Sequence, residues 1–162
     1  MFPQPNLRYH AAMATPHIPV TGGCLCGAVR YASDAPPTEG AFCHCTICRR
    51  SYGGLSAALL RVAAAGFRIT LGEPQRYRSS PIATRSFCAT CGAPLAFAYD
   101  TAADLWLTLG SLDHPEDWPM TPGAAWGPTS HTQATARVPW HEIDDGLPQL
   151  AAPIHRLAAE TR

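Results

Sequence analysis

The seven cysteines constrain what this chain can fold into more than any other feature, because every one of them belongs to a short cluster. An odd number of thiols cannot all pair as intramolecular disulfides. In a reducing compartment, clustered thiols more often bind metal or take part in catalysis. The spacing within each cluster is therefore the central evidence. The clusters are Cys24 with Cys26, Cys43 with Cys45 and Cys48, and Cys88 with Cys91.

The two outer clusters are suited to share one metal ion. In an extended strand, residues two apart point to the same face, so Cys24 and Cys26 can present both sulfurs to an ion while Leu25 faces the core. The CxxC spacing of the last cluster is that of a knuckle turn, and the glycine that follows permits its backbone geometry. Four thiolates complete the tetrahedral sphere that structural zinc prefers. We expect this ion to clip the early and late parts of the chain together.

The middle cluster, CxCxxC, supplies three sulfurs and leaves one position of a tetrahedral ion for water or substrate, as in catalytic zinc sites. The cysteines thus divide into four plus three, which predicts two zinc ions per chain. Spacing alone leaves other arrangements open: His44 as a fourth ligand, a thiolate shared between the ions, or one ion with spectator cysteines. An iron–sulfur cluster also uses thiolates, but its usual cysteine runs differ from these.

Apolar residues in the rest of the chain recur mainly at every second position, which predicts half-buried strands. The clearest examples are residues 67–71, 95–99 and 105–109. The alanine-rich stretch 55–65 is ambiguous, and we interpret it as a strand followed by a short helical turn. Prolines and glycines lie largely between these runs. We expect a mainly β, mostly antiparallel domain over 21–150, with a flexible arm at 1–20 and a tail at 151–162.

Charge and hydropathy give no sign of a polyanionic or membrane partner. Acidic and basic residues balance at 12 each, so no net field attracts nucleic acid or an anionic membrane surface. No apolar run approaches the ~20 residues that span a bilayer, and the first residues lack the pattern of a secretory signal. The sequence predicts a cytoplasmic protein.

Several motifs together resemble the family of glutathione-dependent formaldehyde-activating enzymes, also called the centromere-protein-V domain family. The likeness runs over about residues 20–150 and includes all three cysteine clusters in order. The motifs are GGCLCGAVRY (22–31), FCHCTICRR (42–50), RSFCATCG (85–92), GSLDHP (110–115) and WHEIDDGLP (140–148).

This resemblance implies a fold of the Mss4-like class and a specific chemistry. It implies a structural zinc at Cys24, Cys26, Cys88 and Cys91, and a catalytic zinc at Cys43, Cys45 and Cys48. The implied reaction joins formaldehyde to the thiol of glutathione, giving S-hydroxymethylglutathione, so the protein is expected to be a carbon–sulfur lyase-type enzyme. The implied partners are a small thiol such as glutathione and a small aldehyde. The alternative is a non-catalytic zinc module that binds a protein or nucleic acid, although the neutral charge argues against nucleic acid.

Three residues beside the middle cluster are candidate substrate contacts. Arg49 and Arg50 are the cations nearest to it in sequence, and arginine can clamp a carboxylate with two hydrogen bonds. His44 lies between two predicted ligands and points away from them if the loop is extended, which leaves a packed imidazole or a catalytic base. For Asp113 and His131, a structural role outweighs general base catalysis.

Overall fold

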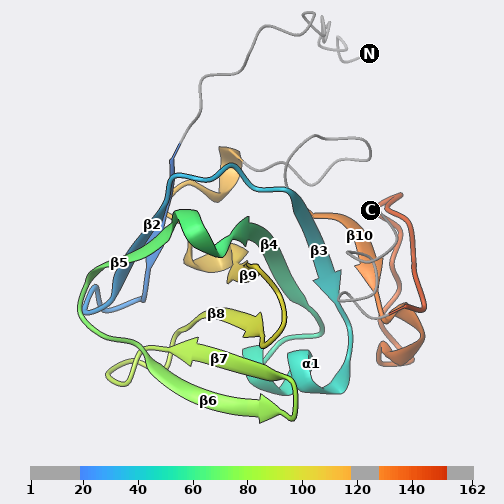
Figure 1. The fold of residues 1–162 in the computed structure, drawn as a ribbon. Coiled ribbons are helices and arrows are strands. Elements are labelled where there is room, and N and C mark those ends of the chain that lie inside the picture. The colour runs from blue at the N-terminus through green and yellow to red at the C-terminus, as the bar shows by residue number, and fades with distance from the viewer. Residues whose placement is uncertain (1–18, 118–127, 153–162) are drawn as a thin grey trace, which may run out of the picture.

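A computed structural model describes residues 19–117 and 128–152 of the chain (Figure 1). The arm expected at 1–20 and the tail expected at 151–162 lie almost entirely outside these residues. Within them the protein is mainly β, as the sequence predicted, with two sheets and a few short helices.

The smaller sheet is antiparallel and has the strand order β1-β2-β5. Its strands are β1 (Val20–Gly23), β2 (Arg30–Ser33) and β5 (Phe67–Leu71). It stands at the left in Figure 1. The segments between β2 and β5 pass through the larger sheet, so the two sheets share a continuous chain and pack together.

The larger sheet has seven strands in the order β10-β3-β4-β9-β8-β7-β6. Every neighbouring pair is antiparallel except β10 and β3, which run parallel. Its strands are β3 (Glu39–Cys43), β4 (Ala57–Ala63), β6 (Gln75–Ser80), β7 (Ala83–Phe87), β8 (Pro94–Tyr99), β9 (Asp104–Thr108) and β10 (Pro128–Thr132).

The helices are all short. The only α-helix in the described part of the chain is α1 (Thr46–Tyr52), and it ends at Gly53, whose φ of 67° is a left-handed conformation that favours glycine. The 3₁₀ helices are η1 (Ala64–Gly66), η2 (Leu109–Ser111), η3 (Pro115–Asp117) and η4 (Ala134–Ala136). η1 follows β4 directly in the chain, which confirms the strand and short helical turn expected within residues 55–65.

The strands predicted from alternation are present, but their burial differs from the expectation. In β9, Trp106 is buried together with Leu105 and Leu107, so both faces of this strand are covered. In β5, by contrast, Ile69 and Leu71 are exposed. The reason is position in the sheet: β9 has a neighbour on each side and layers on both faces, whereas β5 is an edge strand.

Two apolar clusters lie on opposite faces of the larger sheet. Alternate residues of β4 show this: Leu60 and Val62 belong to the cluster shared with the smaller sheet, and Leu59 belongs to the cluster near α1. Cysteines take part in both clusters, with Cys24 and Cys88 in the first and Cys43 and Cys48 in the second. The larger sheet therefore separates two groups of thiols.

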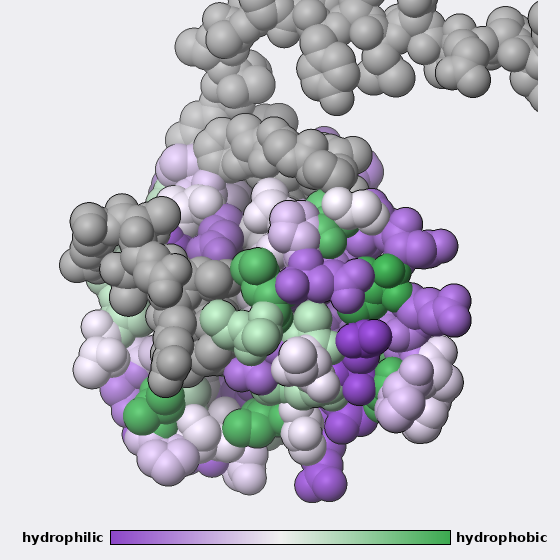
Figure 2. All heavy atoms as spheres, turned by 90° about the vertical axis from the view of Figure 1, so that its right-hand side faces the viewer, coloured by the Kyte–Doolittle hydropathy of each residue, from purple (hydrophilic) through white to green (hydrophobic). Residues whose placement is uncertain are grey.

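No helix within residues 19–117 and 128–152 has the length and apolar character to cross a bilayer. On the face seen in Figure 2, hydrophilic and hydrophobic side chains are interspersed over the described part of the chain.

Candidate metal centres

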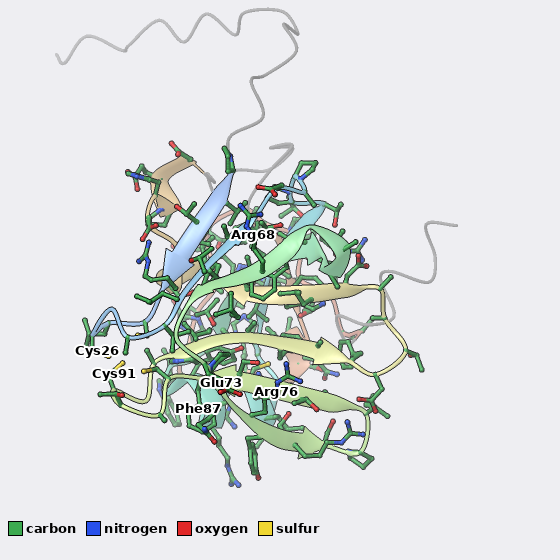
Figure 3. All side chains as sticks on the ribbon, turned by 60° about the vertical axis from the view of Figure 1, so that its left-hand side comes forward. Cys26, Arg68, Glu73, Arg76, Phe87 and Cys91 are labelled. Atoms are coloured by element: carbon green, nitrogen blue, oxygen red, sulfur yellow. The ribbon has the colours of Figure 1, made fainter. Side chains whose placement is uncertain are left out.

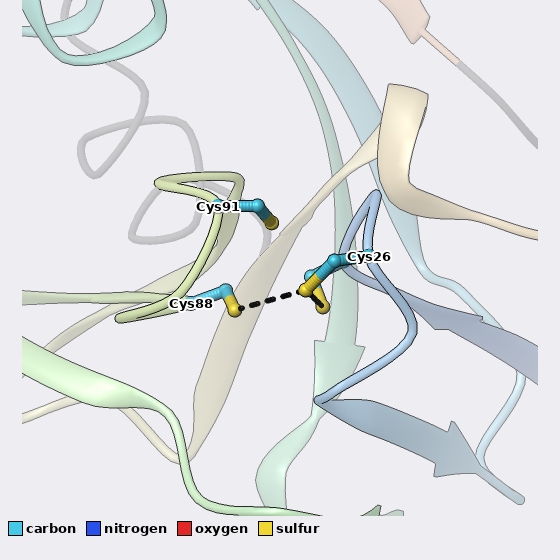
Figure 4. Close-up of side chains that lie close together, drawn as sticks. Cys26, Cys88 and Cys91 are labelled. Atoms are coloured by element: carbon cyan, nitrogen blue, oxygen red, sulfur yellow. Dashed lines mark hydrogen bonds between the residues drawn. The ribbon is translucent and has the colours of Figure 1, made fainter.

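The first group of thiols brings together two turns that are far apart in the sequence. The ligand atoms of Cys24, Cys26, Cys88 and Cys91 all lie within 4.8 Å of one another. Cys26 Sγ is 3.6 Å from Cys24 Sγ and 3.8 Å from Cys88 Sγ. Figure 3 shows Cys26 and Cys91 at the same edge of the molecule, and Figure 4 shows the sulfur of Cys26 facing Cys88 and Cys91.

Cys24 and Cys26 lie in the connection between β1 and β2, not on an extended strand. The Gly27 amide donates to the Cys24 carbonyl at 3.1 Å, which closes a tight turn. This corrects the expectation that Leu25 faces the core, because its side chain is 90% exposed. The turn brings both sulfurs to one side and leaves the intervening leucine in solvent.

Cys88 and Cys91 form the knuckle turn that their spacing predicted. Gly92 has a φ of 73°, in the left-handed region that glycine adopts without strain. Its amide donates to the Cys88 carbonyl at 2.9 Å. A hydrogen bond from the Ala93 backbone lowers the pKa of Cys91 to about 6. The turn therefore favours the thiolate form that binds metal.

The spacing of the four sulfurs fits a tetrahedral metal. Zinc–sulfur bonds of about 2.3 Å in a tetrahedron place the sulfurs roughly 3.8 Å apart. The separations from Cys26 to Cys24 and to Cys88 are 3.6 and 3.8 Å. The Val29 amide also donates to Cys24 Sγ at 3.2 Å, a contact that stabilises a thiolate. This cluster could hold one metal ion.

The second group of thiols lies where β3 runs into α1. Cys43 is the last residue of β3, Cys45 is the N-cap of α1, and Cys48 is in its first turn. Their sulfurs lie within 4.8 Å of one another. The Cys48 amide donates to Cys45 Sγ at 3.3 Å. This N-cap hydrogen bond fixes the position of the Cys45 sulfur at the start of the helix. This cluster too could hold a metal ion.

Three thiols this close cannot all ionise without a cation. Hydrogen bonds from Cys43 and Cys48 lower the pKa of Cys45. The same mutual hydrogen bonding raises the pKa of Cys43 and of Cys48. Without metal, the cluster thus stabilises one negative charge, and a dication would allow the other two thiols to lose their protons.

A pocket of about 440 Å³, which we call the three-cysteine pocket, opens beside Cys43, Cys45 and Cys48. Its other walls come from the β6–β7 connection, from Phe97 and Tyr99 of β8, and from Gln133. Within residues 19–117 and 128–152, no histidine, acidic side chain or further cysteine joins the three cysteines as a fourth donor. The three-cysteine cluster therefore faces a pocket, whereas the four-cysteine cluster already has a full set of protein donors.

Arg85 is the cation that touches the three-cysteine cluster, and sequence spacing did not identify it. Its Nη2 lies 3.6 Å from Cys48 Sγ, and its Nη1 donates to the Tyr52 hydroxyl at 3.1 Å. The guanidinium lies 5.3 Å from the Tyr52 ring centroid and 4.9 Å from that of Phe97. The residue is part of the RSFCATCG motif, but its contacts with Cys48 and Tyr52 of α1 exist only in the folded protein.

His44 packs behind the ligand loop and does not line the pocket. Its Nε2 is 2.8 Å from Nδ1 of His131, and Nε2 of His131 is 2.8 Å from Oδ2 of Asp145. Since a carboxylate can only accept, Nε2 of His131 donates to Asp145, and the other ring nitrogen of His131 shares a hydrogen bond with His44. Burial, followed by repulsion from His131, His141 and Arg137, lowers the pKa of His44 to about 4. The imidazole of His44, between Cys43 and Cys45 in the sequence, is therefore neutral at pH 7.

His44, His131 and Asp145 form a chain of hydrogen bonds. We expect Asp145→Asn to weaken this hydrogen-bond chain and to lower the free energy of unfolding by about 0.5–1 kcal/mol at pH 7. The two carboxylate oxygens of Asp145 accept from His131 and from the Leu147 amide, and the single side-chain oxygen of asparagine carries no full charge and replaces only one of these acceptors. Urea denaturation measures the change. The control is Asp144→Asn, an exposed neighbour, for which a change within about 0.5 kcal/mol is expected. Equal losses in the two variants would contradict a specific role for the His44–His131–Asp145 chain.

The other predicted residues lie apart from the three-cysteine pocket. Arg49 is half-buried, and Arg50 is exposed on α1, where it lines a neighbouring pocket. Asp113 accepts hydrogen bonds from the Thr21 hydroxyl at 2.7 Å and from Arg30. The Arg30 bond lowers the pKa of Asp113. Asp113 therefore ties the segment after η2 to β1 and β2, which is a structural role.

Comparisons with known proteins bear on the fold and on the family of this chain. A crystal structure of a Rhodobacter sphaeroides protein matches with a TM-score of 0.51 and 24% identity, covering 60% of this chain and 93% of that chain. At this identity the match shows the fold alone. A search of curated proteins gave no match. Residues 19–126 match the GFA family, described as glutathione-dependent formaldehyde-activating enzyme. This chain, with its two cysteine clusters on opposite faces of one sheet, belongs to the GFA family.

Proposed function

We propose that this protein is a zinc enzyme that adds a small thiol to a small aldehyde, with glutathione and formaldehyde as the first candidates. Zinc held by Cys24, Cys26, Cys88 and Cys91 would be structural. Zinc held by Cys43, Cys45 and Cys48 would be catalytic. The family description supports the choice of substrates, and the geometry of the two clusters supports the division of roles.

One observation carries the proposal: the three-cysteine cluster forms part of the wall of a pocket of about 440 Å³. A structural site needs four protein ligands, whereas a catalytic site keeps a position open towards a cavity where substrate can enter. The pocket is lined in part by apolar groups such as Pro81, Ile82 and Phe97. These side chains offer an apolar surface beside the place where the sulfur and carbon would react.

The proposed reaction forms one carbon–sulfur bond and needs no oxidant or reductant. The thiol sulfur attacks the aldehyde carbon, the carbonyl double bond becomes a single bond, and the thiol proton ends on the oxygen. Zinc in the three-cysteine cluster would supply a Lewis acid that raises the thiolate fraction of the incoming thiol or polarises the aldehyde oxygen.

Side chains of this protein would assist at both reacting groups. Arg85 keeps a positive charge beside Cys48 and so favours an anionic sulfur in the pocket. Tyr99 also lines the pocket, and burial raises the pKa of its hydroxyl. Its hydroxyl therefore stays protonated at neutral pH and can donate a hydrogen bond to the developing alcohol oxygen.

The test is metal analysis combined with turnover. We expect two zinc ions per chain in fully loaded protein, together with exchange of ¹³C-formaldehyde into S-hydroxymethylglutathione at least about tenfold above the uncatalysed rate. Exchange is followed by NMR at equilibrium. About one zinc per chain would refute the two-site assignment. Two zinc ions without any acceleration would instead support the non-catalytic zinc module.

A further inference from the structure

A second pocket, of about 530 Å³, adjoins the three-cysteine pocket. It lies between α1 and the β6–β7 hairpin, elements that are neighbours in Figure 1. The two pockets share Ile47, Ser79 and Arg85 as lining residues. The two pockets are therefore adjacent, and a ligand that reaches from one into the other would pass beside Arg85. We call the second pocket the outer pocket.

The lining of the outer pocket is positively charged. Arg50 and Arg85 line it, and among the residues that the structure describes no acidic side chain lines it or the three-cysteine pocket. The whole chain is neutral by formal charge, so this is a local excess of positive charge and not a general property of the protein. A cleft with one sign of charge attracts ligands of the opposite sign.

The two arginines differ from the arginines that stabilise the fold. Arg61 and Arg78 have carboxylate partners, whereas Arg50 and Arg85 form no ion pair within residues 19–117 and 128–152. The Arg85 side chain is fixed by Tyr52 and Cys48, yet its Nε is buried without a hydrogen-bond partner among the described residues. Arginines that have no carboxylate partner and lie beside an open pocket are suited to receive an anionic ligand.

We propose that the outer pocket is a carboxylate-binding subsite that selects thiols carrying a carboxylate remote from the sulfur. Arg50 provides the carboxylate contact, and Arg85 lies between this contact and the reacting sulfur. Tyr77, which is 63% exposed, lines the same pocket and offers an apolar surface to the chain that joins the two groups. This subsite rests on the proposed function, because it assigns the far end of a substrate whose thiol reacts at Cys43, Cys45 and Cys48.

The test compares glutathione with glutathione diethyl ester, in which both carboxylates are masked. For zinc-loaded Arg50→Gln we expect kcat/KM with glutathione to fall about tenfold, because a charge-assisted hydrogen bond is lost. With the diester, the change should stay within about twofold. The same loss with both thiols, or no loss with either, would overturn the subsite. Because Arg50 is exposed on α1, the substitution leaves the core intact.

Arg76→Gln is the matched control. Arg76, labelled in Figure 3, is an exposed arginine on β6, next to Tyr77 in sequence, and it lines a different pocket together with Phe67 and Ile69 of β5. The substitution Arg76→Gln changes the net charge by the same amount as Arg50→Gln. We expect it to leave kcat/KM for both thiols unchanged within about twofold. A loss with glutathione equal to that of Arg50→Gln would mean that net charge and not the subsite is responsible.

Calorimetric binding of S-methylglutathione separates this proposal from the proposed function. The ligand keeps both carboxylates but cannot react. If the wild-type protein turns over no thiol, the proposed function fails. Even then, binding that Arg50→Gln weakens about tenfold would support the subsite. Binding that Arg50→Gln leaves unchanged would overturn the subsite, even in a protein that catalyses the reaction.

Discussion

Cys91→Ser is expected to unfold the domain or to lower its melting temperature by at least about 15 °C. The reason is that Cys24, Cys26, Cys88 and Cys91 join the β1–β2 connection to the β7–β8 turn. Apparent binding free energies of structural zinc are as large as the whole stability of a typical domain. Cys91 is only half-buried, so serine fits its position, and the loss reports on metal binding. Circular dichroism melts and zinc content measure it.

Two controls test this explanation. Thr90 is exposed in the same turn, and Thr90→Ser is expected to melt within about 2 °C of the wild type. Chelator treatment of the wild type should reproduce the effect of Cys91→Ser, because it removes the same ion. A Cys91→Ser protein that melts like the wild type would show that this cluster does not hold the fold together.

Cys48→Ser is expected to reduce thiol–aldehyde turnover at least about 100-fold while leaving the fold in place. Changes outside the first ligand sphere alone cost about 10–100-fold in metal affinity or activity, and Cys48 would be a ligand itself. Its sulfur also contacts Arg85, so the substitution disturbs the charge balance of the pocket. The β1–β2 and β7–β8 turns are on the other face of the sheet and keep their four thiols.

The measurement for Cys48→Ser combines ¹³C-formaldehyde exchange, circular dichroism and zinc analysis. One zinc per chain should remain, bound by the four-cysteine cluster. The comparison with Cys91→Ser is the decisive control, because each variant should affect what the other spares. Loss of the fold in both variants, or full activity in Cys48→Ser, would contradict separate structural and catalytic roles for the two clusters.

Much of the candidate site could be predicted from the sequence because metal ligation depends on short-range geometry. Two or three residues of spacing decide whether neighbouring thiols can reach one ion. The structure gathers the seven cysteines as four and three, which is the division that the spacing suggested. Alternation of apolar residues likewise predicted β5, β8 and β9, because side chains of a strand alternate between its faces. The ions themselves stay a prediction.

Residues that act through long-range contacts could not be predicted in this way. Arg49 and Arg50 were the nearest cations along the chain, yet Arg85 of β7 is the one that contacts Cys48. His44 was recognised as a residue between two ligands, but its partners His131 and Asp145 come from a distant part of the chain. The expected burial of Leu25 was wrong, because the CxC cysteines lie in a turn and not in a strand.

By itself, the sequence determined that the protein is mainly β and that its thiols form local groups able to bind metal. The tertiary structure decided that the two clusters lie on opposite faces of one sheet, and that the three-cysteine cluster faces a pocket. The physical reason is that ligand spacing and strand alternation are properties of a few consecutive residues. Pockets and unpaired charges arise only when strands distant in sequence pair and bring Arg85 beside α1.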